Sequence, residues 1–202
     1  MDCTIKFIVL MIIKPILASI ATVMAIAGNV PYLSDVLKKK IQPHPYTWFV
    51  WSIVSMVTFF GQLAKGAGVG VIPTGVAEFF TVIIFFASLR YGFKNIKKID
   101  TYFLIIALFG IIPWILTKDP TVSVIIVVAI DLIAFIPTLR KTWVQPTTES
   151  SWLYRMNVAR HALTLGALQA YNVVTMLHSV AMIITNTMMS LFILKGSLKR
   201  KI

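Results

Sequence analysis

The side chains of this sequence that are best able to do chemistry lie inside long apolar segments. They carry ionisable or amide groups, and they are Glu78, Asp131, Arg160, His161 and Asn186. A charge at the centre of a lipid bilayer costs about 2.5–3.5 kcal/mol on insertion scales, so such a group faces protein or water and usually has a partner. Two interpretations follow: buried pairs that fasten helices together, or a polar site at the middle of the membrane. Ser55 and Asn157 are further candidates for that site, although each could instead form a hydrogen bond between helices.

The composition requires that these segments lie in a membrane. Of the 202 residues, 58% are apolar and 13% are charged, and the mean hydropathy is +0.86. A soluble domain of this size has about 45–50% apolar and about 25% charged residues, so a soluble fold is excluded. Cys3 has no second cysteine to pair with, which excludes a disulfide scaffold. The sequence therefore predicts an integral membrane protein with several spans.

The apolar segments predict seven membrane-spanning helices in one domain that covers residues 1–202. About 20 apolar residues are needed to cross a bilayer as a helix. Alternation of apolar and polar residues, which is typical of a membrane barrel strand, is absent from the sequence. We expect an all-α membrane protein with spans at residues 15–36, 47–63, 69–89, 101–117, 121–139, 152–171 and 174–194.

The distribution of basic residues predicts the orientation of these spans. With seven spans, thirteen lysines and arginines fall on one side of the membrane and four on the other. The positive-inside rule places the N-terminus outside and the basic tail at residues 195–202 in the cytoplasm, by default across a cell (inner) membrane. The net charge of +12 is explained by this orientation and does not imply a nucleic-acid partner.

An internal repeat divides the chain into two halves. Matching residues occur in the same order and at the same expected depth in each half. The matches are Pro31-Tyr32-Leu33 with Pro137-Thr138-Leu139, Gln42-Pro43 with Gln145-Pro146, and Trp48 with Trp152. The repeat assigns residues 15–89 to one three-helix half and residues 121–194 to a second, parallel half. The helix at residues 101–117 links them.

With this 3+1+3 plan, the sequence resembles the PQ-loop and SWEET superfamily of transporters. The resemblance rests on Pro31 and Pro137 near helix ends, on the basic loops that follow them, and on Pro45-Tyr46 at the start of the second span. The Pro-Gln pair of the family reads Pro31-Tyr32 and Pro137-Thr138 here. The resemblance implies a small secondary transporter or facilitator that works by alternating access.

The resemblance also implies roles for two residues of the third helices. The family has an asparagine on the third helix of each repeat, facing the pocket, and Asn186 is similar in position on the seventh span. The corresponding place on the third span is taken by Glu78. A carboxyl in place of an amide extends the expected substrates from neutral sugars to cationic or zwitterionic metabolites, or to a sugar moved together with a proton.

Pro31 and Pro137 have a physical role that does not depend on the resemblance. A proline inside a helix removes one backbone hydrogen bond and kinks the helix, and in lipid the freed carbonyl must find a partner. Two such prolines at one depth predict a pair of hinges at the inner face. The alternative is that both are ordinary prolines of membrane helices, in which they are common.

The charged residues suggest one pairing. The fifth and sixth spans are consecutive and antiparallel, so Asp131 and Arg160 are expected to meet as a structural ion pair. Glu78 then remains as the proton-coupling or substrate-facing group.

We expect a transporter of a small polar metabolite such as a sugar, an amino acid or a vitamin-like compound. No catalytic motif, metal-ligand cluster or cofactor motif is present in the sequence, so we expect neither an enzyme nor a bound cofactor or metal. The expected partners are the substrate and the bilayer, and a homo-oligomer stays open. The alternatives are a structural or assembly membrane protein and a seven-helix receptor.

Overall fold

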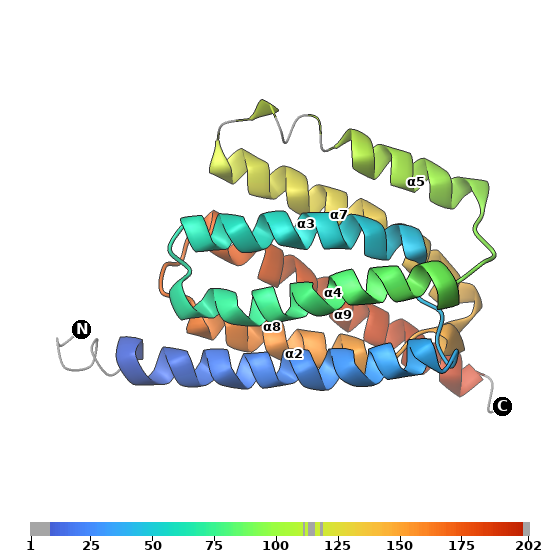
Figure 1. Cartoon of the computed structure of the whole chain (residues 1–202), viewed down its shortest axis with the longest axis horizontal. Coiled ribbons are helices and arrows are strands. Elements are labelled where there is room, and N and C mark those ends of the chain that lie inside the picture. The colour runs from blue at the N-terminus through green and yellow to red at the C-terminus, as the bar shows by residue number, and fades with distance from the viewer. Residues whose placement is uncertain (1–8, 111, 113–115, 118, 200–202) are drawn as a thin grey trace.

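The computed structural model describes residues 9–110, 112, 116, 117 and 119–199, and the described residues form helices joined by short turns (Figure 1). The described residues form one π-helical turn, two 3-10 turns and seven α-helices. In chain order they are η1 (Val9–Ile13), α2 (Lys14–Leu37), α3 (Pro45–Ala64), η2 (Gly68–Val71), α4 (Ile72–Tyr91), α5 (Lys98–Phe109), α7 (Pro120–Val144), η3 (Pro146–Thr148), α8 (Ser151–Ala167) and α9 (Val173–Lys199).

Five of these helices are long and apolar enough to cross a membrane. They lie within Met11–Leu37, Pro45–Ala64, Gly68–Tyr91, Thr121–Val144 and Val173–Gly196, and they correspond to the first, second, third, fifth and seventh predicted spans. This is the composition of a multi-pass membrane protein, and the all-helical prediction is confirmed for the described residues. The other two predicted spans are not reproduced as long helices, because α5 has 12 residues and α8 has 17. Part of the fourth predicted span, at positions 111 and 113–115, lies outside the described residues.

Local sequence signals explain where several helices begin and end. Pro45 and Pro120 stand in the first turns of α3 and α7, where a proline costs no hydrogen bond. The Asp119 carboxylate caps α7 by accepting from the backbone N–H groups of Thr121 and Val122, at 2.7 and 3.0 Å. After α3, the chain turns through Gly66, whose φ of +78° favours glycine.

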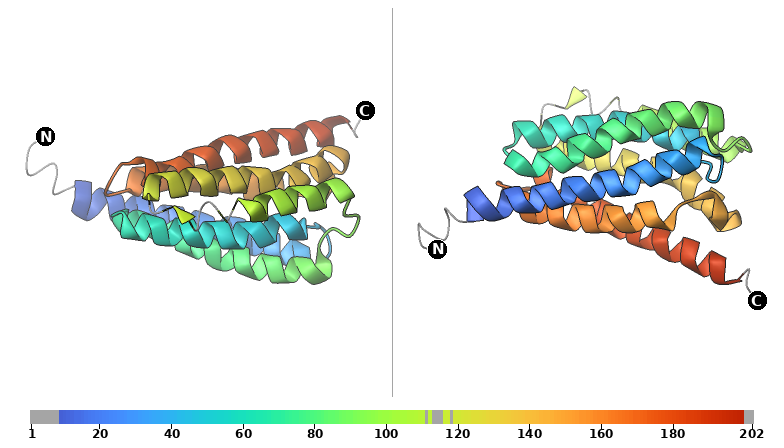
Figure 2. Two further views of the ribbon diagram at one scale, coloured as in Figure 1. Left: turned by 90° about the horizontal axis from the view of Figure 1, so that it is seen from above. Right: turned by 60° about the horizontal axis from the view of Figure 1, so that its bottom comes forward.

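The six longest helices pack in two sets of three with the same internal order. α4 lies between α2 and α3, and α9 lies between α7 and α8, so the third helix of each set separates the first two. Between the sets, α2 packs on α8 and α3 packs on α7, while α5 covers α7 and α3. Successive helices run in opposite directions along the long axis of the molecule (Figures 1 and 2). Each helix of the first set therefore runs in the same direction as its counterpart in the second set.

This order contradicts the predicted pairing of Asp131 with Arg160. Consecutive helices usually lie side by side, but α9 lies between α7, which carries Asp131, and α8, which carries Arg160. The two residues form no ion pair. Asp131 instead lies 3.6 Å from His178 of α9, measured between Oδ2 and Nε2.

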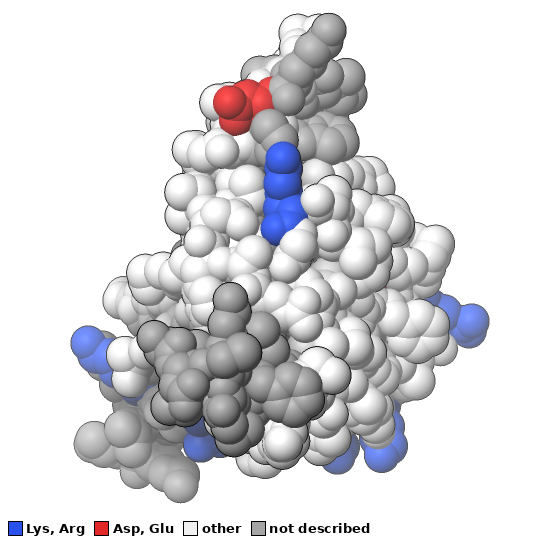
Figure 3. All heavy atoms as spheres, turned by 90° about the vertical axis from the view of Figure 1, so that its left-hand side faces the viewer, with Lys and Arg blue, Asp and Glu red and all other residues white. Residues whose placement is uncertain are grey.

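The two ends of the bundle differ in charge. The turns after α2, α4 and α7 lie at one end together with the end of α9 (Figure 1), and they carry most of the described basic residues. The opposite end, where α2 begins, is mostly uncharged in its described surface (Figure 3). We call these the basic end and the plain end. The end of α9 continues as a helix to Lys199, so the first part of the predicted basic tail is helical.

Candidate functional site

A polar cavity of about 70 Å³ lies inside the bundle, and α2, α3, α4, α7, α8 and α9 all contribute to its wall. It has room for only a few water molecules, since one water needs about 10–15 Å³ measured in this way. All six residues predicted for a site at the membrane middle line this one cavity: Ser55, Glu78, Asp131, Asn157, Arg160 and Asn186. Sequence reasoning therefore named residues that the fold gathers from both sets of helices.

Glu78 of α4 has a buried carboxyl group without an ion pair or a regular hydrogen bond among the described residues, although the Ser55 hydroxyl lies close enough to interact with it. Its side chain lines the cavity and is 7% exposed, and neither carboxyl oxygen accepts a hydrogen bond from the described part of the chain. Ser55 lines the same cavity, but its hydroxyl donates to the carbonyl of Trp51 in its own helix. Two buried acceptor oxygens thus remain open to whatever occupies the cavity.

Two nitrogens of the Arg160 guanidinium on α8 are hydrogen-bonded, and the third has no partner among the described residues. Its Nη2 lies 2.6 Å from Nε2 of His161, and its Nε donates to Asn157 at 3.4 Å. Since arginine can only donate, Nε2 of His161 must accept, and the ring proton then sits on Nδ1, which lies 3.2 Å from the Ser179 hydroxyl. His161 is therefore neutral and orients the guanidinium. Nη1 of Arg160 is buried and has no hydrogen-bond partner among the described residues.

Asn157 and Asn186 form an amide pair between α8 and α9. Asn157 donates to the side-chain oxygen of Asn186 at 3.3 Å, and Asn186 donates to the Met182 carbonyl at 2.7 Å. The pair extends the hydrogen-bonded chain that begins at Arg160. These hydrogen bonds hold Arg160, Asn157 and Asn186 together on the side of the cavity formed by α8 and α9.

His178 belongs to the cavity although its sequence position near a span boundary did not suggest it. It lines the cavity beside Asp131 and is 6% exposed. The signal that points to it is its spacing: His178, Met182 and Asn186 are four residues apart on α9 and therefore share one face. Trp48, Trp51 and Tyr154 also line the cavity and were not predicted as site residues.

Aromatic rings lie between the cavity and the basic end. The ring centroids of Tyr32 and Trp48 are 5.3 Å apart, those of Trp48 and Trp51 are 5.4 Å apart, and Trp51 packs on Phe135 at 5.4 Å. Tyr154 is 6.4 Å from Phe135 and completes the cluster. These contacts join α2 to α3 and α7 to α8, and the Trp51–Phe135 contact joins the two sets of helices.

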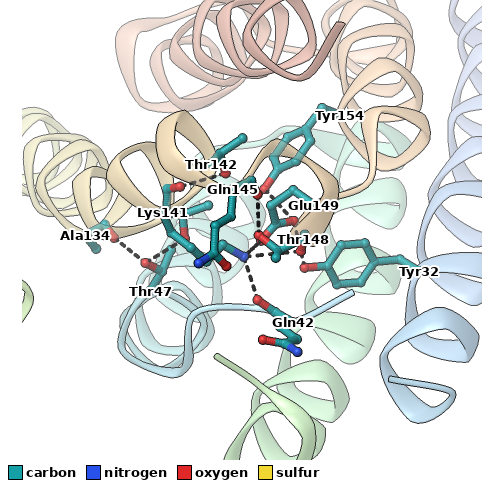
Figure 4. Close-up of polar contacts among 11 residues, drawn as sticks. Tyr32, Gln42, Thr47, Ala134, Lys141, Thr142, Gln145, Thr148, Glu149 and Tyr154 are labelled. Carbon is teal, nitrogen blue, oxygen red and sulfur yellow. Dashed lines mark hydrogen bonds and ion pairs between the residues drawn. The ribbon is translucent and has the colours of Figure 1, made fainter. Parts of the chain in front are cut away.

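A buried ion pair lies just beyond this aromatic cluster (Figure 4). Lys141 Nζ of α7 is 2.5 Å from Glu149 Oε1, and both side chains are fully buried. The other carboxyl oxygen of Glu149 accepts from the hydroxyl groups of Tyr32 and Tyr154, at 3.1 and 3.3 Å. Lys141 also donates to the Gln42 carbonyl at 2.5 Å. The network connects both sets of helices at the basic end.

A second polar connection closes the plain end. Thr74 of α4 donates to the side-chain oxygen of Gln62 at 3.2 Å, and the amide nitrogen of Gln62 donates to the Thr175 carbonyl at 3.2 Å. All three residues are buried. The cavity therefore lies between cross-connections on both sides.

The two prolines predicted as hinges both lie within helices, Pro31 in α2 and Pro137 in α7. Pro31 cannot donate to the carbonyl of Ala27, four residues earlier, and that carbonyl accepts from the indole Nε1 of Trp152 at 2.8 Å. In the turn before Pro137, the Ala134 carbonyl accepts from the Thr47 hydroxyl at 2.7 Å. In each case the donor stands in the first turn of the second helix of the other set.

A separate charged cluster lies outside the spans at the basic end. Asp100 is buried and accepts two hydrogen bonds from Arg140 and one from the Lys97 backbone at 2.8 Å. Burial acts to raise the pKa of Asp100, but the hydrogen bonds from Arg140 and Lys97 outweigh it and hold the pKa below its ordinary value. Burial lowers the pKa of the neighbouring His44 to about 4, so His44 is neutral at pH 7.

Comparisons with known proteins found nothing similar: no family model, no curated protein and no solved structure matches this chain. Within the described residues, no group of three His, Cys, Asp or Glu side chains is arranged to hold a metal ion.

Proposed function

We propose that the protein is a small secondary transporter, or facilitator, that moves a small polar metabolite across the membrane by alternating access. The observation that carries the proposal is the polar cavity inside the bundle, with buried charged atoms that have no hydrogen bond among the described residues, on Glu78 from the first set of helices and on Arg160 from the second. Buried polar groups are nearly always hydrogen-bonded, and transporters bind substrates near the membrane middle, between two structural repeats. A bundle fastened only by buried pairs would engage these atoms itself.

The proposal includes seven crossings with two related halves and α5 as the linker. The shared order of the two sets supports it, because exchanging the sets maps the α2–α8 contact onto the α7–α3 contact. The alternating direction of the helices also supports it (Figure 1). The orientation follows from the charge difference between the ends, with the basic end in the cytoplasm.

In this proposal, the basic end opens when the halves separate at the Lys141–Glu149 network. Both Pro31 and Pro137 lie near that end. In the turn before each proline, a backbone carbonyl accepts a hydrogen bond from a side chain of the other half. A change at these contacts would tilt the last turns of α2 and α7. The conformation described has this end closed.

Uptake into proteoliposomes tests the proposal. The purified protein is reconstituted and offered labelled sugars, amino acids and vitamins, one class at a time. We expect saturable uptake of one class, and we expect Glu78→Gln to reduce it at least tenfold. Arg155→Gln is the matched control, because Arg155 is exposed on α8 and bonds only within its own helix at 3.4 Å. If no class is taken up by folded protein, the structural or receptor alternative replaces the transporter.

A further inference from the structure

The cavity is lined by a glutamate and an arginine that do not pair with each other. Glu78 and Arg160 both line it, and they form no ion pair, although both are more than nine-tenths buried. The other cavity carboxylate, Asp131, lies beside His178. Among the described charged residues of the cavity, the buried atoms without a hydrogen bond are both carboxyl oxygens of Glu78, Nη1 of Arg160 and Oδ2 of Asp131. Oδ2 of Asp131 faces His178, so Glu78 offers the acceptor group and Nη1 of Arg160 the donor group that no ionisable neighbour faces.

Since Glu78 and Arg160 do not pair with each other, each needs a ligand group of opposite charge: a cation for Glu78 and an anion for Arg160. An unpaired buried charge is strongly unfavourable, and a hydrogen-bonded ionic partner relieves it. Chloride would satisfy only Arg160, and a monovalent cation would satisfy only Glu78. A neutral sugar would bring no charged group to either of them.

We propose that the cavity binds a compact zwitterion, with its ammonium group on Glu78 and its carboxylate on Nη1 of Arg160. The inference rests on the proposed function, whose substrate class it names. A carboxylate oxygen accepts a charge-assisted hydrogen bond from the N–H of Nη1, which is stronger than a bond to a neutral acceptor. The cavity volume of about 70 Å³ favours a molecule in which few atoms separate the two charges, as in a small α-amino acid. Asn157 and His161 orient Arg160 and act as positioning residues.

The test is binding to the purified, full-length protein in detergent, read from the shift of its thermal unfolding midpoint with ligand concentration. The probes are L-alanine, ethylamine, propionate and glycerol, which offer both charges, the positive charge, the negative charge and neither. We expect alanine to bind at least about tenfold more tightly than ethylamine or propionate, because each of these lacks one charge-assisted hydrogen bond. Equal binding of alanine and either fragment would overturn the proposal.

Single variants assign each charge to its residue. Glu78→Gln should weaken alanine at least tenfold while propionate binds as before, and Arg160→Gln should weaken alanine while ethylamine binds as before. Arg160→Lys keeps the charge and is the second variant if Arg160→Gln does not fold; it should weaken alanine less. Arg155→Gln, on the exposed side of α8, should change none of the four probes. Unchanged alanine binding in Glu78→Gln contradicts the inference.

Binding and transport can fail separately. Alanine that binds without entering proteoliposomes leaves the zwitterion site in place and refutes the transporter. A sugar that is taken up while alanine does not bind leaves the transporter in place and refutes the zwitterion.

Discussion

At the scale of single residues, the buried charges fall into two groups with different consequences. Lys141 and Glu149 engage each other and have further hydrogen bonds, as do Arg140 and Asp100. In the cavity, Glu78 has no such partner. The first group stabilises the fold, and the second is available to a ligand. The sequence predicted that charges meet at the middle of the bundle, but not which ones pair, because hydropathy gives the depth of a residue and not its neighbours.

Breaking the Lys141–Glu149 pair should destabilise the protein strongly. Glu149→Gln leaves a buried ammonium group without its carboxylate, and breaking a buried pair costs about 3–5 kcal/mol. Lys141→Met combined with Glu149→Gln removes both charges and should recover much of the loss. A double-mutant cycle on thermal unfolding in detergent measures this, with Lys40→Met as the control at an exposed pair. Equal losses in the single and the double variant would show that the ion pair contributes little.

His44 should make stability depend on pH. Its pKa is about 4 in the folded protein and about 6.5 when unfolded, so the unfolded chain binds the extra proton between these values. Stability from a neutral buried His44 is full above pH 6.5 and is lost as the pH falls towards 4. Over this range, the contribution of His44 to the free energy of unfolding falls by about 3 kcal/mol. The thermal midpoints of the parent and His44→Phe, measured from pH 7 to pH 4, should show a smaller decline in the variant. Parallel declines would assign the pH dependence to other groups.

At the scale of helices, the sequence predicted the long apolar elements well and their neighbours poorly. Length and continuous apolarity identify α2, α3, α4, α7 and α9, because these properties are local. α8 is shorter and contains Arg155 and Arg160, so its apolar signal is weaker, although it packs closely on α2. That close packing is visible at Gly28, where an added Cβ would lie 3.0 Å from the Cβ of Met156.

Replacing the two helix prolines should separate gating from folding. Pro31→Ala and Pro137→Ala restore a backbone donor, so stability should hold or rise. At Pro31 the gain should be small, since the Ala27 carbonyl already accepts from Trp152. Proteoliposome uptake should nevertheless fall in both variants, because a straight helix resists tilting. The control is Pro15→Ala in the first turn of α2, where a proline breaks no hydrogen bond. Unchanged uptake in both variants would leave these prolines with a packing role.

At the scale of the whole molecule, the two sets of helices share one internal packing order. The short sequence matches predicted parallel halves, but they could not predict that the third helix of each set lies between the other two. That order depends on which faces of the helices fit together. It explains why residues of α3 and α7, and of α2 and α8, meet across the middle and enclose the cavity. The cavity therefore forms where the two sets of helices pack on each other.

The orientation of the whole molecule gives the last prediction. Lys38 and Lys65 are both exposed, and they lie after α2 and after α3, at the basic end and at the plain end. Because cytoplasmic loops are enriched in lysine and arginine, the basic end should face the cytoplasm. After Cys3→Ser, a membrane-impermeant maleimide should label Lys65→Cys in intact cells and label Lys38→Cys only once the membrane is opened. Each substitution removes one lysine, which leaves the excess at the basic end in place. Labelling of Lys38→Cys in intact cells, alone or together with Lys65→Cys, would refute a single orientation with the basic end inside.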